Sequence, residues 1–173
     1  MDTKNQSIVF NDLRILVVED NENHQKLENL RVVAGRSVVL ARSFSEAVDL
    51  MNTDIFDVLL TSLVMQRDEM YSPLHTTDYE DQDLPLGMVL ALKAVNLEIP
   101  YIGILSDQNK NNSPIVNALQ VVSGDQFPEP QGGPVINELD HCQQADGSKD
   151  WLKALKRTLY GYGIFNDYRP DQD

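Results

Sequence analysis

The stretch that decides the fold of this chain is Phe56-Asp57-Val58-Leu59-Leu60-Thr61-Ser62-Leu63-Val64-Met65. Its apolar centre is short and bounded by polar residues, which predicts a buried strand covered by helices on both faces. Thr61 and Ser62 stand where this strand leaves the core. Because open α/β sheets place their functional groups at the carboxyl edge, this position is the first candidate site. Hydroxyl groups occupy it, and no charged group does.

Strand and helix patterns alternate on both sides of this stretch. Further apolar strands are expected at 13–18, 37–41 and 99–105, with a fifth either near 126–127 or at 134–137. Helical spacing of apolar residues fills the intervals, at 22–34, around 47–51, and at 85–96, 113–122 and 148–159. Such alternation predicts an α/β fold, a doubly wound five-stranded parallel sheet with right-handed crossovers.

Two helices carry specific start signals. Ser43 or Ser45 is expected to cap the helix around 47–51, and Ser148 to cap the final helix. In that final helix the apolar residues are expected to face inward. The basic residues are expected to face solvent, namely Lys149, Lys153, Lys156 and Arg157.

The length of 173 residues predicts a single domain over 1–173 with a core of about 12–160. An acidic loop, 66–84, is inserted after the opening strand, and a tail covers 161–173. The loop carries six acids and one base, a charge of −6 + 1 = −5, so we expect it to be solvated.

The net charge of −13 argues against nucleic acid or an anionic membrane surface as the main partner. The single cysteine, Cys142, excludes an internal disulfide and fits a reducing compartment. The N-terminal residues lack the basic and apolar regions of a signal peptide, and no apolar run approaches the roughly 18 residues of a membrane span. We therefore expect a cytoplasmic protein.

The strand at 13–18, the Phe56–Met65 strand and the strand at 99–105 together resemble the receiver domain of two-component response regulators. The first strand ends in Glu19-Asp20 and then an asparagine, which is similar to the family's metal-binding acidic corner. The family's third strand ends in a phosphoryl-accepting aspartate, five residues after the aspartate that opens it. Counting from Asp57 gives Ser62. The resemblance covers roughly residues 12–130 plus the last helix, and it implies a CheY-like (flavodoxin-like) receiver fold.

Two further positions belong to the family's site. Ser106 follows the strand at 99–105 and matches the family's switch hydroxyl. The family's fifth strand ends in a lysine followed by proline, and in this chain Glu129 precedes a proline at the corresponding place. With Ser62 at the acceptor position and the loop after it expanded, the chain resembles a pseudo-receiver, one without the phospho-acceptor aspartate.

Aspartyl phosphorylation needs a carboxylate nucleophile, a divalent metal and a cation on the phosphoryl oxygens. A serine hydroxyl needs an adjacent general base, and the motifs place no histidine near Ser62. We therefore expect no catalytic residue and no enzymatic activity. Glu19 and Asp20 are left as ligands of weakly bound magnesium, with no cofactor certain. Alternatively these two acids only favour a helix N-terminus, and the hydroxyls of Thr61 and Ser62 only satisfy local backbone groups.

These residues predict a signalling module that works by protein contacts without aspartyl phosphorylation. The expected partner is a histidine kinase-like or other signalling protein, and the aromatic tail also allows a homodimer. The alternative is a metal- or small-ligand-responsive regulatory domain that uses the acidic corner and the loop 66–84. A third hypothesis, a slow enzyme with Ser62 or Thr61 as nucleophile, lacks a Gly-x-Ser-x-Gly elbow or a phosphate-binding glycine loop.

Overall fold

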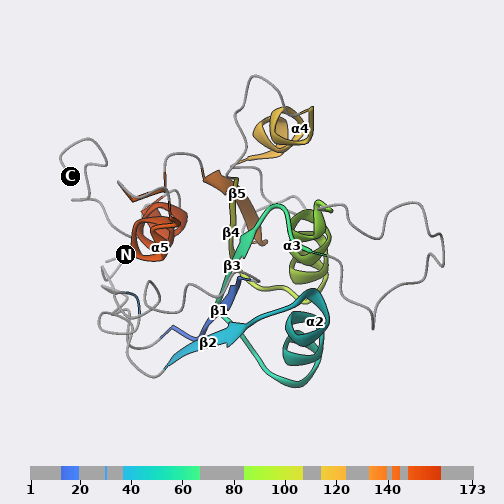
Figure 1. Cartoon of the computed structure of the whole chain (residues 1–173). Helices are drawn as coiled ribbons and strands as arrows, with labels where there is room; N and C mark the ends of the chain where they lie inside the picture. The colour runs from blue at the N-terminus through green and yellow to red at the C-terminus, as the bar shows by residue number, and fades with distance from the viewer. Residues whose placement is uncertain are drawn as a thin grey trace, which may run out of the picture.

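The computed structural model describes residues 13–19, 30, 37–66, 84–106, 114–123, 133–139, 142–144 and 148–160. Five strands form one sheet in the order β2-β1-β3-β4-β5, and every neighbouring pair is parallel (Figure 1). Their bounds are β1 Ile15–Val18, β2 Val38–Ala41, β3 Val58–Ser62, β4 Tyr101–Leu105 and β5 Val135–Leu139. This order is that of the flavodoxin-like doubly wound fold, which CheY shares, so the predicted fold class is confirmed.

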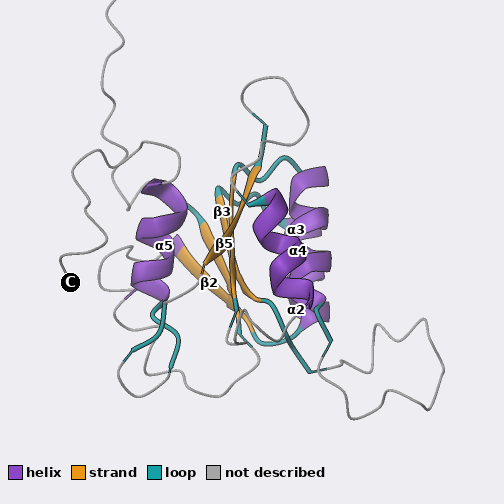
Figure 2. Cartoon of the chain, turned by 90° about the horizontal axis from the view of Figure 1, so that it is seen from above, coloured by secondary structure: helices purple, strands orange, loops and turns teal. Residues whose placement is uncertain are grey.

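Helices cover both faces of the sheet (Figure 2). α2, α3 and α4 lie on one face and α5 lies on the other. Their bounds are α2 Phe44–Thr53, α3 Leu86–Asn96, α4 Pro114–Val122 and α5 Trp151–Tyr160. Among the described residues no helix is both long and apolar enough to cross a membrane.

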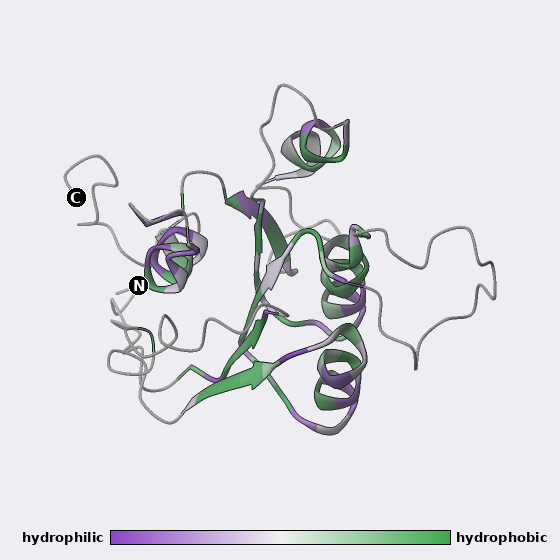
Figure 3. Cartoon of the chain, viewed as in Figure 1, coloured by the Kyte–Doolittle hydropathy of each residue, from purple (hydrophilic) through white to green (hydrophobic). Residues whose placement is uncertain are grey.

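The sheet separates two hydrophobic cores. The central strands between these cores are largely hydrophobic (Figure 3). Within β3 all five residues are buried. Leu59 belongs to the core under α2, α3 and α4, whereas Val58 and Leu60 belong to the core under α5. This alternation follows from the two-residue period of a strand, and it explains why Val58, Leu59 and Leu60 are all apolar.

The helix starts confirm one cap prediction and correct another. The hydroxyl of Ser43 accepts a hydrogen bond from the backbone N–H of Glu46 at 3.2 Å, so Ser43 caps α2. At α5 the carboxylate of Asp150 accepts from the N–H of Lys153 at 2.9 Å. Asp150, and not Ser148, therefore receives this first-turn N–H, because α5 begins at Trp151.

The fifth strand corresponds to the second of the two predicted positions, since β5 is Val135–Leu139. It pairs with β4, against which α5 also packs closely. A Cβ atom at Gly103 of β4 would clash with the hydroxyl of Thr158 on α5. The absence of a side chain at Gly103 therefore lets α5 approach the centre of the sheet.

Candidate functional site: a lysine at the ends of two central strands

Glu19 and Ser62 lie together at the carboxyl ends of β1 and β3. Glu19 follows β1 directly and Ser62 is the last residue of β3. The two strands are parallel neighbours, with Val18 paired to Thr61. By the alternation along each strand, Glu19 continues the row of Val17, and both it and Ser62 face the α5 side of the sheet. The structure thus unites two of the residues that the sequence predicted for the site.

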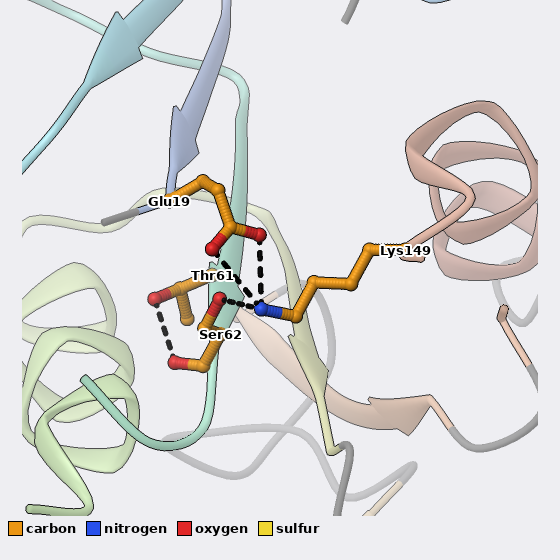
Figure 4. A network of polar contacts seen from close by, with 4 residues as sticks. All are labelled: Glu19, Thr61, Ser62 and Lys149. Carbon is orange, nitrogen blue, oxygen red and sulfur yellow. Dashed lines mark hydrogen bonds and ion pairs between the residues drawn. The ribbon is translucent and has the colours of Figure 1, made fainter. Parts of the chain in front are cut away.

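Lys149 completes this cluster (Figure 4). Its ammonium donates hydrogen bonds to both carboxylate oxygens of Glu19, at 2.9 and 3.1 Å, and to the hydroxyl of Ser62 at 2.7 Å. The side chains of Lys149 and Glu19 are 12% and 9% exposed, and Ser62 is 1% exposed. An ammonium has three protons to donate, and these contacts supply three oxygen acceptors. The arrangement is a hydrogen-bonded ion pair in which Glu19 is buried and Lys149 is partly buried.

The backbone around Lys149 is fixed before α5 begins. Lys149 forms an isolated antiparallel bridge with Gln143. The N–H of Gln144 donates to the carbonyl of Ser148 at 2.7 Å, and the N–H of Asp150 donates to the carbonyl of Cys142 at 2.8 Å. This short pairing presents Lys149 toward the sheet edge, so the lysine is held in place from both its backbone and its ammonium.

Thr61 has a different environment from Ser62. Its side chain is fully buried, and its hydroxyl donates to the carbonyl oxygen of Ser62 at 3.1 Å (Figure 4). This contact agrees with the expectation that the Thr61 hydroxyl satisfies a local backbone group. The Ser62 hydroxyl instead contacts the Lys149 ammonium.

Ser106 directly follows β4, whose last residue, Leu105, is paired with Ser62. It is half-buried and stands one residue further along the strand next to the cluster. Asp20 and Glu129 lie outside the described residues. Of the residues predicted for the site, the structure therefore places Glu19, Ser62 and Ser106 at neighbouring strand ends.

Two sequence interpretations need correction. The correspondence of Glu129 to the family's lysine requires a fifth strand near 126–127. Since β5 is Val135–Leu139, Glu129 precedes the strand and cannot follow its carboxyl end. Lys149 was expected to face solvent with the other bases of the final helix, but it points into the cluster because it precedes the first turn of α5. No signal in the sequence indicates this position of Lys149, because the residue does not directly follow β5.

The described residues do not fit a divalent metal at the acidic corner. Such an ion needs several carboxylate or carbonyl oxygens free to coordinate it. Both oxygens of Glu19 accept hydrogen bonds from Lys149. Within the described residues there is also no group of three or more His, Cys, Asp or Glu side chains that could hold a metal. Among the described residues, the ammonium of Lys149 supplies the cation of this cluster.

Fold and cluster together define a doubly wound α/β domain with an ion pair at the carboxyl ends of its central strands. No protein-family model matches the chain, and no curated protein matches it. Among solved structures, the receiver domain of a Francisella response regulator is similar, with 20% sequence identity and a TM-score of 0.47. The match covers 88% of this chain and 98% of that domain. The assignment of the fold rests on the strand order and on the parallel register.

Proposed function

We propose that this chain is an atypical receiver-type signalling module that acts through protein contacts and without aspartyl phosphorylation. The observation that carries the proposal is the hydroxyl of Ser62 at the carboxyl end of β3, 2.7 Å from the ammonium of Lys149. A receiver that accepts a phosphoryl group needs a carboxylate at this position. Here the place is taken by a neutral group that is already hydrogen-bonded.

The neighbours of Ser62 argue against a nucleophilic serine. Activation would require a base that removes the hydroxyl proton. The side-chain nitrogen that contacts the Ser62 hydroxyl is the ammonium of Lys149, which donates to this hydroxyl and has no lone pair to accept its proton. Ser62 is also only 1% exposed, so a phosphodonor has no direct access to it. Both facts support a module without enzymatic activity.

The internal hydrogen bonds of the cluster also favour a signal received through protein contacts over one received through a small ligand. Both oxygens of Glu19 and the hydroxyl of Ser62 are bonded within the chain. The alternative, a metal- or small-ligand-responsive domain that uses the acidic corner, would have to displace Lys149 first. The partner in our proposal is a histidine kinase-like or other signalling protein, or a second copy of this chain.

Incubation with acetyl phosphate and magnesium tests the proposal. Intact-mass analysis at neutral pH should show no phosphoryl adduct on the wild-type chain, while a phosphorylation-competent receiver treated in parallel should be modified. The variant Ser62→Ala serves as a background control for non-specific acylation. A stoichiometric, acid-labile adduct on the wild-type chain, mapped to a carboxylate at the sheet edge, would show that the proposal is wrong.

A further inference from the structure

We propose that the ammonium of Lys149 is a built-in cation that takes the place of a metal ion at the acidic corner. The inference deepens the proposed function, on which it rests, because it concerns how the same site is held. A receiver site that takes its cation from solution depends on metal concentration. In this chain the cation is part of the polypeptide, so its presence beside Glu19 does not depend on the metal concentration.

The contacts of the ammonium support this role. Its three oxygen acceptors come from the ends of two different strands, Glu19 after β1 and Ser62 at the end of β3. The ammonium therefore bridges the two central strand ends, as a shared metal ion would. Among the described residues of the cluster, one carboxylate and one ammonium form a pair without net charge. A divalent ion entering beside them would be repelled by the lysine, and the repulsion is strong in a poorly solvated site.

The cation also reaches the cluster from a defined direction. Lys149 lies two residues before α5, and its backbone is paired with Gln143. Its ammonium lies 6.0 Å from the ring centre of Trp151, the first residue of α5. Filling the site with Lys149 thus ties the start of α5 to the ends of β1 and β3. A metal ion from solution could not make this covalent connection.

A metal-rescue experiment tests the inference. Lys149→Met keeps most of the side-chain volume and leaves the buried carboxylate of Glu19 without its ammonium. The variant should melt at a lower temperature than the wild type. Added Mg²⁺ or Mn²⁺ should then raise the melting temperature of Lys149→Met by at least about 3 °C at 10 mM, because binding to the folded state stabilises it. The wild-type melting temperature should stay constant in the same titration.

Two control variants isolate the cluster. Lys153→Met makes the same charge change four residues later, where the structure shows a backbone contact to Asp150 but none to Glu19. It should show no metal-dependent gain. Glu19→Gln combined with Lys149→Met removes both charges, and it should lose the rescue because the carboxylate ligand is gone.

The inference can also be tested on the wild-type chain, without any variant. Titration with Mn²⁺, followed by the electron paramagnetic resonance signal of the free ion, should show no stoichiometric binding at concentrations below about 1 mM. Weak association of the ion with surface carboxylates requires higher concentrations than this. Binding below that concentration would overturn the inference, even if Lys149→Met failed to fold. A folded Lys149→Met that gains nothing from either metal would also overturn it. Metal binding without a phosphoryl adduct would refute this inference alone, whereas an adduct on the wild type would refute the proposed function.

Discussion

Gly87 of α3 packs directly against the carbonyl group of Ser62. A Cβ atom at Gly87 would overlap the carbonyl oxygen of Ser62 and would lie 2.9 Å from the Cα atom of Leu63. The N–H of Gly87 donates to the carbonyl of Leu63 at 3.0 Å. Ser62 is therefore held from both faces of the sheet, by the backbone of α3 through its peptide group and by Lys149 through its hydroxyl.

Gly87→Ala tests this contact. In a helix without such a contact the change from glycine to alanine stabilises by about 1 kcal/mol. Here the added methyl group meets backbone atoms, which cannot rotate away, so α3 or the end of β3 must shift. We expect a loss of about 2–3 kcal/mol in the free energy of unfolding, measured by urea denaturation. A stabilised variant would contradict the close packing of α3 on Ser62.

The fold was predictable because apolar periodicity determines which segments are strands. β1 and β3 are buried on both faces, and the apolar runs Ile15–Val18 and Val58–Leu60 identify them in the sequence. The fifth strand was ambiguous, since Val135 and Ile136 are its only apolar pair and are followed by Asn137 and Glu138. A strand with two half-buried polar residues at an edge of the sheet gives a weak signal.

The site was predictable only in part. Two-residue alternation from Val17 to Glu19, and from Leu60 to Ser62, places both polar groups on one face of the sheet. Which helix covers that face is set by the tertiary structure. The structure shows that it is α5, so a lysine just before α5 can reach both groups. The sequence alone could not give this, because Lys149 and Glu19 are 130 residues apart.

Substitutions of Ser62 should depend on Lys149. Ser62→Ala removes one acceptor of the buried ammonium and should cost about 1–2 kcal/mol in the free energy of unfolding. Ser62→Asp places a second carboxylate beside the ammonium, which Lys149 can partly neutralise. In a Lys149→Met background the same aspartate faces Glu19 without that ammonium. The Ser62→Asp and Lys149→Met changes should therefore be coupled by about 2 kcal/mol in a double-mutant cycle of urea denaturation. Strictly additive effects would show that the two side chains do not interact.

Leu90 and Leu92 offer a matched comparison within α3. Leu90 is fully buried in the core under α2, α3 and α4, whereas Leu92 is 55% exposed. Leu90→Ala should cost about 2–5 kcal/mol because it removes core contacts and leaves a cavity. Leu92→Ala should change the free energy of unfolding by no more than about 0.5 kcal/mol. Equal losses, measured by urea denaturation, would mean that α3 is rotated about its axis relative to this structure.

Cys142, the single cysteine, allows a test of the segment before α5. Burial raises the pKa of its thiol above the ordinary value of 9.0, while the nearby Arg157 opposes part of this effect. The folded chain thus keeps the thiol proton at a pH where the unfolded chain has lost it. Below the unfolded pKa the resulting stability is fully present, and it is lost as pH rises through the folded pKa.

The rate of reaction with a disulfide reagent should therefore follow a titration curve displaced to higher pH in the native chain than in the urea-unfolded chain. The midpoint reports the pKa, and the plateau reports access to the buried sulfur, so the two effects separate. Arg157→Gln removes the group that donates to the sulfur at 3.9 Å and should move the midpoint further upward. Lys156→Gln, a neighbouring charge change, should move it less, because Lys156 is not among the groups that shift this thiol. Coincident native and unfolded curves would contradict the burial of Cys142 beside Lys149 and α5.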